Sequence, residues 1–125
     1  MSYAMKVAKF VGPDFAMYSG NDDLIIPVLS AGGSGVISVY ANIMPKMCHQ
    51  IVENYLNGNH VQALADHLKY LDLMNNLFIE VNPIPVKTAM NMMGLNAGTL
   101  RLPLWEMTEE HQAVLRNSLK EAGLL

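Results

Sequence analysis

Few side chains in this sequence have the type and spacing that catalysis requires. Asp22 and Asp23 are adjacent carboxylates that could serve as a general acid and base, but neighbouring residues at the start of a helix point in different directions. We interpret them, with Asn21, as helix-capping groups that place negative charge in a first turn. Cys48 lies on the apolar stripe of a predicted helix, which favours an inert buried thiol over a nucleophile.

Metal chemistry has little support in the sequence. The candidate nitrogen ligands are His49, His60, His67 and His111. No cysteine or third ligand lies at a spacing that suits zinc, so we interpret the histidines as surface or partly buried side chains. The candidate soft ligands are Met90, Met92 and Met93, whose spacing indicates helix packing rather than a metal site.

Two further features look functional over only a few residues. The segment Gly33-Ser34-Gly35 resembles a phosphate-binding loop, but it lacks the third glycine and leads into a strand, so a tight helix-to-strand turn is favoured. Lys87 is a candidate Schiff-base amine, yet it follows Pro85 in the first turn of a helix, which predicts a solvated or ion-paired lysine. The residues alone therefore predict no catalytic group, no metal and no cofactor.

The first half of the chain is predicted to contain one parallel strand–helix–strand unit. Helices are expected over residues 2–11 and 23–31, and strands over residues 15–19 and 36–39. The second strand is nearly all apolar, as expected for a strand buried on both faces. Two strands joined by a helical crossover should be parallel.

The second half is predicted to be helical, which makes the fold class mainly α. Helices are expected over residues 44–56, 61–80 and 86–93, followed by an irregular stretch over 96–107 and a last helix capped by Thr108. The helix over 61–80 carries an apolar stripe of Leu64, Leu68, Leu71 and Phe78, widened by Leu73, Met74 and Leu77.

Composition indicates that this chain shares apolar surface with other segments. Of the 125 residues, 51% are hydrophobic and 15% charged, ten are methionines, and two strands alone do not make a stable sheet. A net charge of −3 without a basic cluster argues against a nucleic-acid partner. One cysteine, no apolar run of membrane-spanning length and no signal pattern predict a cytoplasmic protein with no membrane partner.

Four segments, in order and at matching spacing, resemble the dihydrodipicolinate synthase family. They are Tyr18-Ser19-Gly20-Asn21-Asp22-Asp23, Gly32 to Asn42 (GGSGVISVYAN), Asn82-Pro83-Ile84-Pro85-Val86-Lys87, and Leu100-Arg101-Leu102-Pro103-Leu104. The last four residues, AGLL, also resemble the C-terminus of that family. The resemblance covers essentially the whole chain.

The resemblance implies a (β/α)₈ TIM barrel followed by helices, of which this chain matches only the last part. A complete barrel takes about 250 residues. Residues 1–57 would be the end of helix 6, strand 7, helix 7, strand 8 and helix 8, and residues 58–125 the C-terminal helical region. The family is usually tetrameric and condenses pyruvate with aspartate semialdehyde in lysine biosynthesis, through a Schiff base on a lysine of strand 6.

The same resemblance implies which residues carry function here. Ile37 matches the residue of strand 8 that contacts pyruvate, and Gly20 matches a glycine at the same cavity mouth. The Schiff-base lysine, a tyrosine and a threonine pair would all precede Met1, so we expect a truncated, inactive chain. The alternatives are a non-catalytic module that forms homo-oligomers through strand edges and apolar helix faces, or a piece of another pyruvate aldolase such as a sialic acid lyase.

Overall fold

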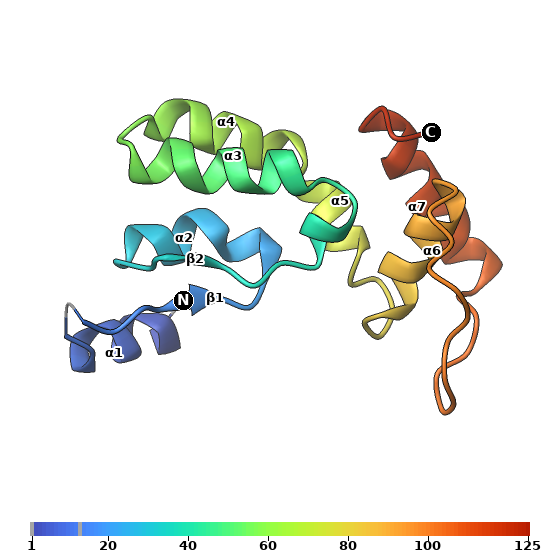
Figure 1. The fold of residues 1–125 in the computed structure, drawn as a ribbon, viewed down its shortest axis with the longest axis horizontal. Coiled ribbons are helices and arrows are strands. Elements are labelled where there is room, and N and C mark those ends of the chain that lie inside the picture. Colours follow the sequence, from blue (N-terminus) through green and yellow to red (C-terminus); the bar gives the residue numbers. More distant parts are fainter. Residues whose placement is uncertain (1, 13) are drawn as a thin grey trace. The chain divides into compact units, whose positions relative to one another are not determined.

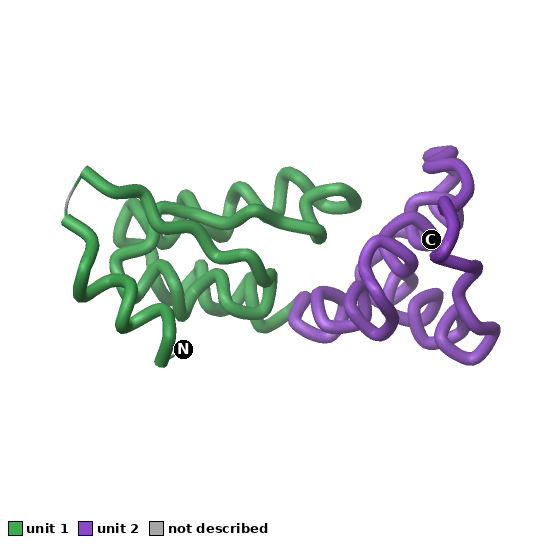
Figure 2. The backbone as a smooth tube through the Cα atoms, turned by 90° about the horizontal axis from the view of Figure 1, so that it is seen from below, with its two compact units in different colours: residues 1–69 green, residues 70–125 purple. Residues whose placement is uncertain are grey.

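Two short parallel strands stand among helices in the computed structural model, which describes residues 2–12 and 14–125. Strand β1 (Tyr18–Ser19) pairs with β2 (Gly35–Val36), with Tyr18 opposite Gly35 and Ser19 opposite Val36. The predicted class, mainly helical with one parallel strand pair, is confirmed. The chain divides into two compact units, Met1–Lys69 and Tyr70–Leu125, shown in separate colours in Figure 2.

The first unit places helix α2 between the strand pair and two longer helices (Figure 1). Its elements in chain order are α1 (Ser2–Phe10), β1, the 3₁₀ turn η1 (Asp22–Leu24), α2 (Ile25–Ser30), β2, the 3₁₀ turn η2 (Tyr40–Asn42), α3 (Pro45–Leu56) and α4 (His60–Lys69). Ile25, Val28 and Leu29 of α2 are buried, together with Ile51 of α3 and Ala63 of α4. This apolar core fixes the two strands against the helices.

The strands are shorter than the sequence predicts. The expected strands over 15–19 and 36–39 reduce to two residues each, although Ser34 N still donates to Met17 O at 2.7 Å and Ile37 N to Ser19 O at 2.8 Å. A strand exists only where a neighbour supplies hydrogen bonds, and each strand here has one neighbour among the described residues. The expectation of burial on both faces is therefore wrong for Ile37, whose exposed fraction is 71%.

The turn between α2 and β2 depends on glycine. Gly32 has a φ of +88°, which favours glycine over residues with a side chain. At Gly33 a Cβ atom would lie 2.7 Å from both the carbonyl oxygen and Cγ1 of Val28. The interpretation of Gly33-Ser34-Gly35 as a tight turn is thus confirmed.

The second unit consists of α5 (Leu71–Asn76), α6 (Ile84–Met92) and α7 (Glu109–Glu121), with α7 in contact with both other helices. Its buried side chains include Leu73, Met74, Leu77, Leu115 and Leu119. Asn76 Nδ2 donates to Ser118 Oγ at 2.8 Å and joins α5 to α7. The predicted irregular stretch between α6 and α7 is confirmed.

The single helix expected over residues 61–80 is wrong. The chain leaves the helix at Tyr70, where φ is −110° and ψ is 10°, and α4 and α5 belong to different units. Of the predicted stripe, Leu64, Leu68 and Phe78 are exposed, whereas Ala63 and His67 of α4 are buried. The face of α4 that packs carries a small residue and polar ones, so hydropathy alone did not identify it. The boundary that the resemblance implies, with the barrel over residues 1–57 and the helical region over residues 58–125, stays a prediction.

Glu80 holds the beginning of α7. Its Oε1 accepts hydrogen bonds from Thr108 N and Thr108 Oγ1, both at 3.0 Å, and lies 2.8 Å from Nδ1 of His111. Thr108 Oγ1 in turn accepts from His111 N at 3.4 Å, which confirms Thr108 as the cap. Partial burial raises the pKa of Glu80, but the hydrogen bonds from His111 and Thr108 outweigh it and lower that pKa.

Glu80→Ala should lower the free energy of unfolding by about 1–2 kcal/mol, because a helix cap and a charged hydrogen bond are lost together. A carboxylate with a lowered pKa stabilises the fold at neutral pH, and this contribution disappears as the pH falls below the usual glutamate range. Urea unfolding followed by circular dichroism measures the change. Glu121→Ala, at the far end of the same helix, is the matched control, and equal midpoints for the two variants would contradict the role of Glu80.

Candidate functional site at the strand ends

The carboxyl ends of β1 and β2 bring the two predicted site residues together. Gly20 directly follows β1 and Ile37 directly follows β2, and the residues before them, Ser19 and Val36, are register partners. The Ile37 side chain is exposed, and a Cβ on Gly20 would meet nothing within 4 Å. Both positions therefore line one open edge, and this is the edge at which parallel sheets bind ligands. Their role in substrate binding stays a prediction.

Asp22 is the charged centre of this edge. Its Oδ2 accepts hydrogen bonds from Val39 N at 3.1 Å and Tyr40 N at 2.9 Å, and the residue is only 1% exposed. The expectation that side chains of residues 21–23 cap the following helix is wrong, because Asn21 makes no side-chain cap bond and the Asp22 carboxylate binds the chain after β2 instead. The expected negative charge is confirmed, since Asp22 and Asp23 lie in the first turn of η1. An aspartate at a strand end was the only signal in the sequence, and it does not reveal a partner 17 residues away.

Two hydrogen bonds of Ser19 shape the turn that carries Asp22. Ser19 Oγ donates to Asn21 O at 2.7 Å and accepts from Asn21 N at 3.2 Å. The serine therefore holds the turn after β1, and Asp22 joins that turn to the segment after β2. The site is a pair of strand-end turns held by side-chain to backbone hydrogen bonds, with an apolar residue exposed beside them.

His67 is the polar side chain that sequence reasoning missed. It is 3% exposed, and its Nε2 lies 3.1 Å from the backbone oxygen of Asp23. Burial lowers the pKa of His67, while the Asp23 carbonyl and the charges of Asp23 and Asp22 act in the opposite direction. The interpretation as a surface or partly buried histidine is wrong for His67, because its side chain lies on the packed face of α4.

The other histidines agree with the interpretation of surface or partly buried side chains. His49 and His60 are exposed, and the ring of His60 stacks on Tyr55 with centroids 4.5 Å apart. His111 is partly buried beside Glu80. Within residues 2–12 and 14–125, no group of three or more histidine, cysteine or acidic side chains is placed to hold a metal ion.

Cys48 is a buried thiol, as the sequence predicts. It is buried in α3, and burial raises the pKa of the Cys48 thiol; a hydrogen bond from Ser38 acts against this, and the charge of Asp22 adds to it. Since the thiolate is the nucleophile, a raised pKa lowers the reactivity of the thiol at neutral pH. Cys48 borders a hollow of about 290 Å³ whose lining includes Tyr18 and Val36 of the strands.

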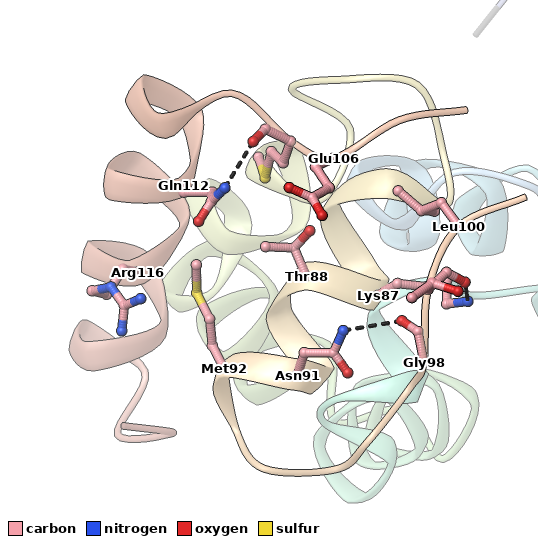
Figure 3. A pocket seen from close by; sticks show the side chains of 11 residues that line it. Lys87, Thr88, Asn91, Met92, Gly98, Leu100, Glu106, Gln112 and Arg116 are labelled. Carbon is pink, nitrogen blue, oxygen red and sulfur yellow. Dashed lines mark hydrogen bonds between the residues drawn. The ribbon is translucent and has the colours of Figure 1, made fainter. Parts of the chain in front are cut away.

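A hollow in the second unit lies beside the loop between α6 and α7. It has a volume of about 430 Å³ and is lined by residues of both helices and of that loop (Figure 3). Lys87 Nζ donates to Thr99 O in an exposed hydrogen bond, and the interpretation of Lys87 as a solvated or ion-paired lysine stays a prediction. Asn91 accepts from Ala97 N at 2.7 Å and donates to Gly98 O at 3.1 Å. These polar groups hold the loop and form no nucleophile–base pair.

The positions of the lysines and of the clustered methionines are those expected for residues of helices. The lysines all lie in helices, at positions 6, 9, 46, 69, 87 and 120. Met90, Met92 and Met93 are each half-buried, as helix packing requires. In the part of the chain that the structure describes, no helix combines the length and apolarity needed to cross a membrane.

Comparison with known protein families shows the family to which this chain belongs. The sequence model of the dihydrodipicolinate synthetase family matches residues 1–122. The chain belongs to this family. Among relatives, 4-hydroxy-tetrahydrodipicolinate synthase of Clostridium perfringens (strain SM101) is 52% identical over all 125 residues, which are 43% of that relative. The chain thus spans less than half the length of this relative.

Solved structures of family members have the same fold over the matched region. The dihydrodipicolinate synthase of Thermotoga maritima is 48% identical with a TM-score of 0.87, over 90% of this chain and 38% of the other. The enzyme of Acinetobacter baumannii, solved in complex with pyruvate, is 37% identical with a TM-score of 0.91, over 98% of this chain and 42% of the other. The resemblance to this family noted in the sequence is thereby confirmed.

Proposed function

We propose that these 125 residues are the C-terminal part of a synthase that condenses pyruvate with aspartate semialdehyde in lysine biosynthesis. The observation that carries this is 52% identity over the entire chain to a relative named 4-hydroxy-tetrahydrodipicolinate synthase. In the proposed assembly β1 and β2 are the last two strands of a (β/α)₈ barrel, residues 1–57 complete the barrel, and residues 58–125 form the helical region. The complete enzyme is an oligomer.

The chain contributes the rim of the pyruvate site rather than its nucleophile. Ile37 and Gly20 contact pyruvate from the strand ends, where both lie beside each other. Asp22 holds the backbone behind Ile37 through Val39 N and Tyr40 N. Segments outside these 125 residues supply the Schiff-base lysine and the proton-transferring tyrosine and threonines. A reactive lysine needs surroundings that lower its pKa, and the six lysines here all lie in helices rather than in the strands or in the turns that directly follow them.

We expect no pyruvate adduct on the isolated 125-residue chain after borohydride reduction, because the two strands and the turns that directly follow them contain no lysine. Mass spectrometry of the intact protein measures adduct formation. An adduct on any of the six lysines would contradict the proposal that the Schiff-base lysine lies outside these 125 residues.

A chimera provides the matched positive control. In it, these 125 residues replace the 125 residues that they match in the C. perfringens synthase. The proposal requires that the folded chimera gives a borohydride-stable pyruvate adduct on a lysine outside the exchanged segment. Turnover with aspartate semialdehyde, rather than with another aldehyde, then separates the synthase from an aldolase such as a sialic acid lyase.

A second candidate function is assembly without catalysis. Each strand has one neighbour among the described residues, so both outer edges of the pair are free there. Large apolar side chains are exposed in the same unit; they include Tyr3, Phe10, Phe15, Tyr18 and Ile37. Open strand edges and exposed apolar groups promote pairing between chains.

We expect the isolated chain to self-associate, because pairing of strand edges buries these groups. Light scattering after size exclusion should give a mass of at least twice 13.8 kDa. Tyr18→Lys on β1 should shift the equilibrium towards monomer, since an edge lysine opposes strand pairing. A monomer with cooperative unfolding would rule out the assembly function.

A further inference from the structure

We propose that His67 is a positioning residue, which fixes the strand-end turns from the outer helix α4 through the backbone of Asp23. Its Nε2 lies 3.1 Å from the Asp23 oxygen, although 44 residues separate the two in sequence. His67 is only 3% exposed, so water does not compete for this contact. The consequence for catalysis rests on the proposed function, whereas the structural role does not.

The direction of the hydrogen bond determines the protonation state of the imidazole. A backbone oxygen only accepts, so Nε2 must carry the proton and donate it. Nδ1 is buried and has no hydrogen-bond partner among the described residues. A proton on Nδ1 would therefore be a buried donor without an acceptor. The arrangement requires the neutral ring with a proton on Nε2 and a bare Nδ1.

The contact between His67 and Asp23 is linked to the segment around Ile37 through the neighbouring residue, Asp22. Asp23 follows Asp22, whose carboxylate holds Val39 N at 3.1 Å and Tyr40 N at 2.9 Å. Val39 and Tyr40 come two and three residues after Ile37. The Ile37 N–H donates a hydrogen bond to Ser19 O at 2.8 Å. Holding the Asp23 carbonyl therefore limits how far the Asp22 carboxylate, and with it the backbone behind Ile37, can move.

Buried apolar packing is the competing explanation for a histidine at this place. His67→Leu keeps most of the volume and removes the donor, whereas His67→Gln keeps an amide N–H near the position of Nε2. A packing role predicts similar behaviour of the two variants or a preference for leucine. A positioning role predicts that glutamine restores what leucine loses.

Two measurements on the full 125-residue chain test the proposal. Nitrogen-15 spectra of labelled histidine should show His67 as the neutral Nε2–H tautomer at pH 7; an Nδ1–H tautomer or a charged ring would overturn the assignment. Amide hydrogen exchange at Val39 and Tyr40 should become about tenfold faster in His67→Leu and return close to the wild-type rate in His67→Gln. His49→Leu, on an exposed helical histidine, should change neither amide.

The proposal is overturned if His67→Leu leaves both amides unchanged, or if both His67 variants accelerate exchange equally throughout residues 2–69. In the chimera, His67→Leu should raise KM for pyruvate with little change in kcat, and His67→Gln should reverse the effect. An inactive chimera that keeps the Nε2–H tautomer and the protected amides would refute the proposed function and leave the role of His67 intact.

Discussion

Replacing Asp22 with alanine is expected to lower the free energy of unfolding of the chain by about 3 kcal/mol. The carboxylate is almost fully buried and accepts two backbone hydrogen bonds, from Val39 N and Tyr40 N. Hydrogen bonds to a charged group each contribute about 1.5–3 kcal/mol, and alanine leaves two donors without an acceptor. A loss of this size is a large part of the stability of a small domain, which is about 5–15 kcal/mol.

Asp23→Ala is the matched control for this loss. Asp23 uses its backbone oxygen in the contact with His67, and none of the described residues forms a hydrogen bond with its carboxylate. Its replacement should cost less than about 0.5 kcal/mol, as at most surface positions. Asp22→Asn, which keeps a neutral oxygen, should fall between the two. Urea unfolding at fixed protein concentration distinguishes them, and an Asp22→Ala midpoint equal to that of Asp23→Ala would contradict the role of Asp22.

Ile37→Asp in the chimera is expected to lower kcat/KM for pyruvate by about 100-fold, which corresponds to about 2.7 kcal/mol of transition-state binding. A carboxylate at Ile37 would repel the carboxylate of pyruvate at a site where an apolar contact is proposed. Ile37 lies just beyond β2 and is not one of the buried core residues of the first unit, which makes a folding defect a small part of the change.

Ile37→Val is the control, since it keeps the apolar contact and removes one methylene group. Its kcat/KM should stay within about fivefold of the parent chimera, as one buried methylene contributes about 0.8 kcal/mol. Equal activity of Ile37→Asp and Ile37→Val would show that Ile37 does not contact the substrate.

Local signals in the sequence located most of the helices, although the single helix expected over 61–80 is divided into α4 and α5. Thr108 was predicted as a cap and accepts from His111 N, and Gly32 to Gly35 end α2 in a tight turn. Such features depend on residues close in sequence, so propensity and capping patterns suffice to find them. The strand lengths were overestimated, because hydrogen bonds from a neighbouring strand, and not the residues themselves, define where a strand ends.

The site was harder to predict because its contacts join distant residues. Gly20 and Ile37 were found by resemblance, and the strand register does place them side by side. Asp22 was interpreted as a cap of the helix that follows it, since nothing local shows that its carboxylate binds the backbone of Val39 and Tyr40. His67 was interpreted as a surface or partly buried histidine, and its full burial was missed because the apolar stripe of Leu64 and Leu68 indicated that another face of the helix is buried.

The activity of the chimera tests the central claim most directly. If these 125 residues are the C-terminal part of a pyruvate-dependent synthase, the chimera with the C. perfringens enzyme should condense pyruvate with aspartate semialdehyde within about tenfold of the parent kcat/KM. That limit corresponds to about 1.4 kcal/mol, a modest loss for a segment 52% identical to the one it replaces. A chimera that folds and forms the parent oligomer but has no condensation activity would contradict the claim.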